Sequence, residues 1–150
     1  MDWQIRKFQE KDISLYLEGE IASFQASYPE ISINEQIKSE FKNSLLRNIE
    51  LKNVVCYTLE EIDPVAFVVI GSQHFLNAPV GYIENIYVKP DARRKGYGRV
   101  LLKQASTHLK NEGISSLELD VTAFQEEAKS LYESEGFSVI GFRMGKSIEP

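Results

Sequence analysis

Apolar residues recur at about every fourth position through much of the N-terminal third of the chain, which is the spacing of helices with one buried face. One stripe covers residues 13–24 and stops before Pro29, because proline cannot continue a helix; Asp12 stands at its N-cap position. A second stripe covers residues 37–49. Before the first helix, apolar and polar residues alternate over residues 3–8 and predict a short strand.

The middle of the chain is rich in β-branched and aromatic residues, which are typical of strands. Residues 54–59 and 65–70 flank a polar stretch and predict a β-hairpin. Residues 71–79 contain glycine, asparagine and proline and predict a loop. The next strand is expected at residues 80–88, and Pro90 marks its end.

The last third of the chain alternates between helix and strand. A helix is expected from Gly98 to a left-handed cap at Gly113, followed by a strand at residues 117–121. A further helix ends at Gly136 and leads into a final strand at residues 137–144. The predicted order is strand, two helices, three strands, then helix, strand, helix and strand, which indicates a mixed α/β fold.

Length and charge narrow the picture. A chain of 150 residues suits one hydrophobic core, so residues 1–150 are expected to form a single domain. The formal net charge of -5 disfavours general binding to nucleic acid or anionic membranes, so any anion site must be local. The lone Cys56 excludes an intramolecular disulfide and favours a reducing compartment. Without a signal-peptide pattern or a membrane-spanning stretch, a cytoplasmic location is expected.

One loop between an expected strand and an expected helix carries the clearest chemistry. Three successive cations, Arg93, Arg94 and Lys95, precede Gly96 and Gly98. Glycines with positive φ expose successive backbone N–H groups, and the helix dipole adds partial positive charge, so this loop suits a phosphate or pyrophosphate. The pattern is neither a P-loop nor a dinucleotide-binding motif. Taken alone, it also fits a solvated basic turn.

Two motifs occur together in this half of the chain. V-x-P-x-x-R/Q-x-x-G-x-G/A is matched from Val88 to Gly98, and L-x-V-x(6)-A-x-x-L-Y-x-x-x-G-F is matched from Leu119 to Phe137. The pair resembles the GNAT superfamily of acyl-CoA-dependent N-acyltransferases, specifically over residues 80–145. The resemblance implies a twisted central β-sheet, mostly antiparallel with one parallel, splayed strand pair, and with helices on both faces.

The resemblance also implies acetyl-CoA as co-substrate and no metal. The backbone N–H groups of residues 93–99 would bind the pyrophosphate of coenzyme A, and the basic side chains would add charge. The pantetheine arm would lie along the preceding strand, where Ile86 and Val88 offer backbone hydrogen bonds and a nearby N–H polarises the thioester carbonyl. As plain sequence, these are core strand residues. The residues implied in coenzyme binding are Ile86, Tyr87, Val88, Arg93, Arg94, Lys95, Gly96, Tyr97, Gly98, Arg99, Gln125 and Tyr132.

Tyr132 is the implied general acid. It stands where the family commonly has a tyrosine that protonates the departing thiolate, although alone it fits a helix aromatic packed beside Leu131 and Phe137. Gln125 replaces the family's usual asparagine near the coenzyme. It is expected either to contact the coenzyme or to form a capping box with Thr122.

A general base is needed, because only a free amine attacks a thioester and the acceptor must first lose the proton of its ammonium. Glu84 is the candidate, since it lies two residues before Ile86 on the strand that would hold the acyl group. Simple alternation places Glu84 on the face of Ile86 and Val88 unless a bulge changes the register. A salt-bridged or edge-exposed glutamate is the alternative, and Tyr82 is the second choice for the base.

Other reactive side chains carry less weight. His74 is expected in a loop, either solvated or lining the mouth of the acceptor site, and His108 is expected on the exposed side of a helix. Cys56 is expected to be a small buried hydrophobe rather than an acyl-carrying nucleophile. Direct transfer is therefore favoured over a ping-pong reaction.

The sequence thus predicts an N-acetyltransferase that moves an acetyl group from acetyl-CoA to a primary amine of a small molecule or peptide, in a ternary complex. The resemblance implies that residues 18–35 form one wall of the acceptor site. Two alternatives stay open: a non-catalytic acyl-CoA-binding or regulatory module, and a protein N-terminal or lysine acetyltransferase. The expected partners are acetyl-CoA and an amine, without nucleic acid or membrane. A homodimer through an exposed C-terminal strand also stays open.

Overall fold

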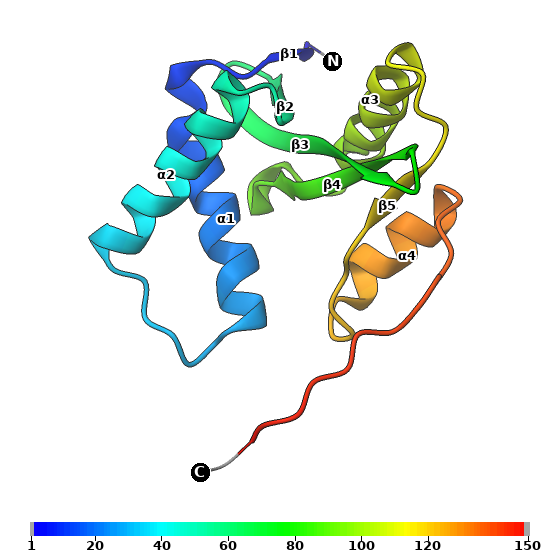
Figure 1. Ribbon diagram of the computed structural model, residues 1–150. Helices are drawn as coiled ribbons and strands as arrows, with labels where there is room; N and C mark the ends of the chain where they lie inside the picture. Colours follow the sequence, from blue (N-terminus) through cyan, green and yellow to red (C-terminus); the bar gives the residue numbers. More distant parts are fainter. Residues whose placement is uncertain (1, 149–150) are drawn as a thin grey trace.

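Within residues 2–148, which the computed structural model describes, five strands lie in one sheet in the order of the chain (Figure 1). Each of the first four strands pairs antiparallel with the next, and the fifth pairs parallel to the fourth. The strands are β1 (Gln4–Lys7), β2 (Val54–Glu60), β3 (Pro64–Phe75), β4 (Ala78–Val88) and β5 (Leu117–Leu119). The predicted sheet, mostly antiparallel with one parallel pair, is confirmed.

Helices cover both faces of the sheet (Figure 1). α1 (Ile13–Ser27) and α2 (Glu35–Glu50) pack on one face, and α3 (Tyr97–Asn111) and α4 (Glu126–Ser134) pack on the other. Two 3-10 turns, η1 (Glu10–Asp12) and η2 (Pro90–Ala92), complete the elements. No helix among the described residues has the length and apolar character needed to cross a lipid bilayer.

β3 runs through the middle of the sheet, and its side chains contribute to two cores. Because successive side chains of a strand point to opposite faces, Ala66, Val68 and Ile70 pack toward α3. Phe67 and Val69 pack toward α1 and α2. All five are at most 4% exposed to solvent. The sheet is therefore covered on both sides at its centre.

α1 approaches the sheet closely at Gly19. A Cβ at this position would lie 2.6 Å from the ring of Phe67 and 2.8 Å from the Cβ of Tyr87. Neither distance is compatible with ordinary van der Waals contact, so the close packing of α1 on β3 and β4 requires glycine here. α2 begins as predicted after Asn34, whose side chain accepts a hydrogen bond of 2.9 Å from the N–H of Ile37.

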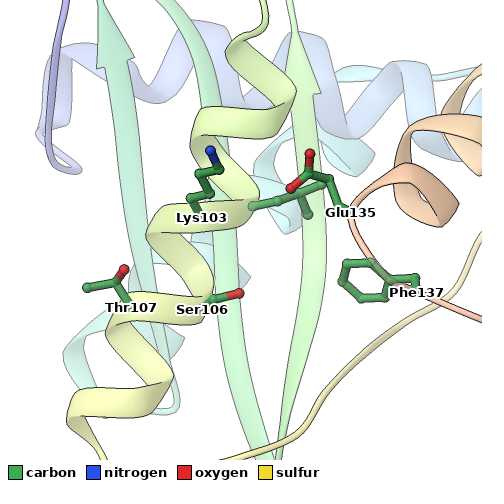
Figure 2. Close-up of a pocket in the computed structure, with 6 residues that line it drawn as sticks. Lys103, Ser106, Thr107, Glu135 and Phe137 are labelled. Atoms are coloured by element: carbon green, nitrogen blue, oxygen red, sulfur yellow. The ribbon is translucent and has the colours of Figure 1, made fainter.

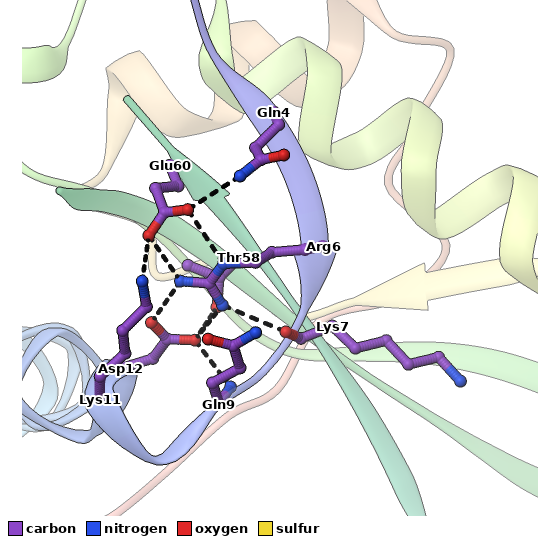
Figure 3. A network of polar contacts seen from close by, with 8 residues as sticks. All are labelled: Gln4, Arg6, Lys7, Gln9, Lys11, Asp12, Thr58 and Glu60. Atoms are coloured by element: carbon purple, nitrogen blue, oxygen red, sulfur yellow. Dashed lines mark hydrogen bonds and ion pairs between the residues drawn. The ribbon is translucent and has the colours of Figure 1, made fainter. Parts of the chain in front are cut away.

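Asp12 is the N-cap residue of α1, as predicted, but its side chain makes no cap hydrogen bond to this helix, because a charge network occupies the carboxylate (Figure 3). Asp12 accepts hydrogen bonds of 2.7 and 2.9 Å from Arg6 and one of 2.9 Å from the hydroxyl of Thr58. Arg6 also donates to Glu60 at 3.0 Å, and Lys11 reaches the same carboxylate at 2.7 Å. The network joins β1, η1 and β2.

The predicted loop over residues 71–79 is wrong, because β3 and β4 continue their pairing to Phe75 and Ala78. The two strands meet in a tight turn in which Leu76 has φ 49° and Asn77 has φ 66°. Successive left-handed residues are typical of two-residue hairpin turns, which match the twist of the strands they join. β3 and β4 therefore form a ribbon that extends beyond the core.

The predicted final strand at residues 137–144 is also wrong, since the described residues after α4 contain no strand. The chain runs away from the sheet here (Figure 1), and Val139, Phe142 and Met144 are 58%, 91% and 92% exposed. A strand forms only where its backbone finds a ladder partner, and the described part of β5 has only three residues, fewer than the sequence predicts. The homodimer contact expected through that strand therefore has no basis in the described residues.

Candidate active site

β4 carries a bulge at Glu84. Val69 of β3 pairs with Asn85 and Ile70 pairs with Ile83, which leaves Glu84 as the extra residue. Glu84 and Asn85 consequently line the same cavity on the side of α1 and α2. The common face of Glu84 with Ile86 that simple alternation predicts is lost through this bulge, and Ile86 packs into the core on the other side of the sheet.

Beyond the bulge, one edge of β4 has no strand beside it among the described residues. β5 pairs with β4 only from Gly81 to Ile83. The N–H of Lys89 donates to the carbonyl of Val65 on β3 at 2.9 Å. Because hydrogen-bonding directions alternate along an antiparallel strand, the backbone groups of Ile86 and Val88 point to the opposite, open side. The strand residues predicted to bind the pantetheine arm thus face a free edge.

The basic loop, residues 93–96, connects η2 to the start of α3. Arg94 has φ 64° and Gly96 has φ 82°, so the backbone turns through left-handed positions immediately before the helix. Such a turn gathers N–H groups at a helix N-terminus, where the helix dipole favours an anion. In the first turn of α3, a Cβ on Gly98 would lie 2.8 Å from a methyl carbon of Leu131. Glycine there lets α3 and α4 pack closely beside the loop.

Most cations in this region already have partners. Lys95 forms an ion pair of 2.9 Å with Glu61, and Arg99 forms one of 2.9 Å with Glu135. Arg93 donates from Nε to the carbonyl of Val88 at 2.9 Å and lies 5.9 Å from the centroid of the Tyr87 ring. Arg94 makes no hydrogen bond or ion pair through its side chain with any described residue. Backbone groups, with Arg94 beside them, therefore dominate this anion site.

A cavity of about 620 Å³ lies between the sheet and the helices α1 and α2. Tyr16 and Glu20 of α1 line it, together with Glu84 and Asn85 of β4. Asn85 donates to Glu20 at 2.8 Å, and the Glu84 carboxylate lies over Gly71, where a Cβ would come within 2.9 Å of its Oε1. Although Glu84 is exposed, partial desolvation and the nearby charge of Glu20 raise the pKa of its carboxyl.

Tyr132 lies on α4 and packs against the larger core, with its ring edge-on to Phe137 at 5.9 Å. Burial raises the pKa of its phenol, so the hydroxyl keeps its proton at neutral pH. The hydroxyl makes no hydrogen bond to a described residue. Tyr132 therefore holds a proton that it is free to donate.

Comparison with known proteins identifies the family. The sequence model of the acetyltransferase (GNAT) family matches residues 16–137. The chain belongs to this family. The family membership predicted from the two motifs is confirmed, and the predicted enzyme class, an acyltransferase, is that of the family.

Known proteins resemble the GNAT chain over different shares of their length. A stretch of 54 residues is 44% identical to the [ribosomal protein bS18]-alanine N-acetyltransferase of Escherichia coli strain K12 and covers 36% of each chain. The chain thus spans about a third of this relative. The structure of a predicted acetyltransferase with acetyl-CoA from Clostridium acetobutylicum has TM-score 0.77, 22% identity and coverage of 97% and 96%. An aminoglycoside 6'-N-acetyltransferase from Acinetobacter haemolyticus has TM-score 0.76, 18% identity and coverage of 98% and 99%. These structures confirm the GNAT fold.

Two residues predicted at the coenzyme site have surroundings in this GNAT fold that the sequence alone does not give. The side chain of Tyr97 is buried in the larger core, so only its backbone faces the basic loop. The capping box of Thr122 and Gln125 does not form, because α4 begins at Glu126 and Gln125 itself is the N-cap residue, without a side-chain cap. The coenzyme contact of Gln125 stays a prediction.

The histidines differ from expectation, whereas the cysteine agrees with it. His74 lies on β3 rather than in a loop and lines the cavity beside Glu84. His108 is partly buried, with its Nδ1 3.1 Å from the hydroxyl of Tyr57. Cys56 is buried, and burial raises the pKa of its thiol, which disfavours the nucleophilic thiolate.

Two parts of the surface escape prediction from the sequence. Besides the expected segment 18–35, polar residues of α2 and of the turn after it, among them Asn48 and Lys52, line the cavity. Their signal is only a polar side on a helix, which is typical of solvated faces as well. A separate groove of about 300 Å³, lined by Lys103, Phe137 and their neighbours, lies along α3 on the other side of the sheet (Figure 2). It is therefore not part of the cavity at Glu84.

Proposed function

We propose that this chain transfers the acetyl group of acetyl-CoA to a primary amine of a small molecule or peptide, by direct attack in a ternary complex. One observation carries the proposal: the free edge of β4 runs from a bulge at a cavity to the basic loop, where Arg94 and Gly96 have left-handed backbone conformations just before the N-terminus of α3. A thioester bound along this edge has a carboxylate at one end and an anion site at the other.

The coenzyme is proposed to bind in the same order. Its pyrophosphate takes the N–H groups of the basic loop and the start of α3, and Arg94 adds charge. Its pantetheine arm lies along Ile86 to Val88 as an additional strand. The structure from Clostridium acetobutylicum, whose fold this chain shares, is described as containing acetyl-CoA, which supports the assignment.

Glu84 and Tyr132 are proposed to handle the protons. The Glu84 carboxylate takes a proton from the ammonium of the acceptor, and the free amine attacks the carbonyl carbon of the thioester. A C–N bond forms, the C–S bond breaks, and the sulfur leaves with the electron pair. Tyr132 gives its hydroxyl proton to the thiolate and regains one from solvent, while the nitrogen and the protonated Glu84 each release a proton to solvent. No step passes an acetyl group to Cys56, in agreement with its buried thiol.

The cavity supports a cationic acceptor, because Glu20 and Glu84 both line it. The aminoglycoside 6'-N-acetyltransferase shares the fold, and the relative from Escherichia coli is named for the alanine of a ribosomal protein, so small amines and protein N-termini both stay open. Competition between a diamine and an N-terminal peptide for the same acetyl-CoA separates the two. Residues 1–150 are proposed to act as one domain, and a cytoplasmic location stays a prediction.

The first experiment measures the thermal unfolding temperature with and without millimolar acetyl-CoA, with ADP as the control. A ligand that binds only the folded state raises this temperature. A larger rise with acetyl-CoA than with ADP supports the coenzyme site, and release of free thiol on adding amines then supports transfer. No rise at saturating acetyl-CoA rejects the proposal, whereas binding without thiol release favours the non-catalytic module.

A further inference from the structure

The turn between β2 and β3 touches the basic loop through a single carboxylate. Oε1 of Glu61 accepts a hydrogen bond of 2.5 Å from the hydroxyl of Tyr97 and one of 2.9 Å from Nζ of Lys95. These two residues flank Gly96, whose φ of 82° gives the loop its left-handed step. One carboxylate oxygen of the neighbouring hairpin thus binds the side chains of both residues that flank Gly96.

Burial of Tyr97 in the core fixes the position of the hydroxyl that binds Glu61. The Tyr97 side chain is only 2% exposed and belongs to the larger core, and its ring lies edge-on to Trp3 at 6.2 Å between centroids. Hydrogen bonding to Glu61 raises the pKa of Tyr97 to about 12, and the bonds from Tyr97 and Lys95 lower the pKa of Glu61. A charged carboxylate therefore accepts from a neutral phenol at neutral pH.

The Lys95 side chain also contacts Glu61 and Tyr97. Its ammonium pairs with Glu61 and lies 5.8 Å from the centroid of the Tyr97 ring, within the range of a cation–π contact. The side chain is thus held by the hairpin and the core. The sequence instead predicts that Lys95 adds charge to the pyrophosphate site.

We propose that Glu61 is a positioning residue for the pyrophosphate of coenzyme A, which it serves by holding Lys95 and Tyr97 on either side of Gly96. The inference rests on the proposed function, because it takes the basic loop as the pyrophosphate site. A loop that is already ordered loses less conformational entropy when the ligand binds. Lys95 accordingly acts on the loop backbone and not as a ligand of the phosphates.

The opposite role of Lys95 makes an opposite prediction. If its ammonium bound the phosphates, Glu61 would compete for it, and removing the carboxylate charge would strengthen coenzyme binding. If Glu61 positions the loop, the same change weakens binding. The sign of one substitution therefore separates the two roles.

The experiment compares Glu61→Gln with the wild type on acetyl-CoA and on S-acetylpantetheine, which lacks the pyrophosphate. The glutamine keeps an acceptor for Tyr97 but loses the charge that holds Lys95. We expect KM for acetyl-CoA to rise by about three- to tenfold with kcat unchanged, and the kinetics with S-acetylpantetheine to stay at the wild-type level. Asp63→Asn removes one charge from the same turn and serves as the control, because the Asp63 side chain makes no hydrogen bond or ion pair with a described residue.

A second variant, Lys95→Met, completes a double-mutant cycle. If both residues act through one contact, the double variant has about the KM of either single variant. Tighter binding in Glu61→Gln, an equal loss on both donors, or a strictly additive double variant overturns the inference. Failure of the proposed function has a different signature, because the wild type itself then shows no thermal shift with acetyl-CoA.

Discussion

At the scale of single residues, the surroundings of Glu84 and Tyr132 raise the pKa of both side chains. Desolvation and Glu20 raise the pKa of the Glu84 carboxyl, which makes its anion a better proton acceptor. Burial raises the pKa of Tyr132, which keeps the phenol protonated. The two groups thus suit the opposite tasks proposed for them, Glu84 to accept a proton and Tyr132 to donate one.

Substitution of Glu84 by glutamine tests the base. The amide cannot accept the proton of an ammonium, so we expect kcat to fall by about a hundredfold or more while KM for acetyl-CoA stays near the wild-type value. Steady-state thiol release measures both constants. Asn85→Ala, at the next position of the bulge, is the control for a loss of shape. An activity close to that of the wild type would remove Glu84 from the mechanism.

The charge of Glu20 should shift the pH dependence of kcat/KM. The proposed mechanism requires ionised Glu84, so it predicts that activity rises with pH through the raised pKa of that group. Glu20→Gln removes a negative charge that contributes to the raised pKa, which therefore falls. The acidic limb is expected to move to lower pH, and a limb that stays in place would show that another group titrates.

Tyr132→Phe tests the acid. The variant keeps the ring contact with Phe137 but loses the proton, so we expect kcat to fall by about ten- to a hundredfold while the thermal shift with acetyl-CoA persists. A non-catalytic binding module would show the same shift and no turnover in either form. Wild-type turnover that the substitution leaves unchanged argues instead that Tyr132 only packs.

At the scale of the elements, close contact fixes where the helices lie on the sheet. Gly19→Ala places a Cβ 2.6 Å from the ring of Phe67, so α1 must move away from β3 and β4. Despite the better helix propensity of alanine, we expect a net loss of about 1–2 kcal/mol in the free energy of unfolding. Urea titration measures this change. Gly141→Ala, where a Cβ meets nothing within 4 Å, should leave stability unchanged.

Periodicity predicts the elements whose stability depends on one buried face. The stripes at residues 13–24 and 37–49 correspond to α1 and α2, because burial alone orients those helices. The ribbon at residues 71–79 was missed, since backbone pairing across a turn at Leu76 maintains it without a buried face. The strand at 137–144 was wrong for the converse reason: its side chains alternate, but no ladder partner adjoins them.

In the candidate site too, features that are local in sequence are predicted, whereas features that depend on contacts between distant segments are not. The motifs locate the basic loop, because glycine and helix-start chemistry are local in sequence. The orientation of Glu84 depends on a bulge, and a bulge is set by the register between two strands. The partners of Lys95 and Tyr97 come from a hairpin more than thirty residues away, so no local pattern includes Glu61.

At the scale of the whole molecule, the network of Arg6, Asp12 and Glu60 ties β1 and η1 to β2, about fifty residues further along the chain (Figure 3). Arg6→Gln leaves the Asp12 carboxylate, 1% exposed, without its charged partner. We expect a loss of about 1–3 kcal/mol in the free energy of unfolding, measured by urea titration. Lys38→Gln breaks an exposed pair on α2 and should change it by at most about 0.5 kcal/mol.

This network also sets a pH dependence. Burial acts to raise the pKa of Asp12, but the hydrogen bonds from Arg6, Gln9 and Thr58 outweigh it, so its pKa lies below the ordinary 3.8. The stabilisation is therefore complete above that value and is lost as pH falls through the lowered pKa. Arg6→Gln should flatten this acid dependence. A wild-type slope retained in the variant would contradict the assignment.

The order of the sheet has a consequence for how the protein is made. Because strand order across the sheet is chain order, each strand that leaves the ribosome finds its neighbour already synthesised. The sheet can grow from one edge to the other without parting two formed strands to admit a later one. β5 is last in this growth and pairs with β4 only from Gly81 to Ile83, so the rest of that edge, where the coenzyme is proposed to bind, stays open.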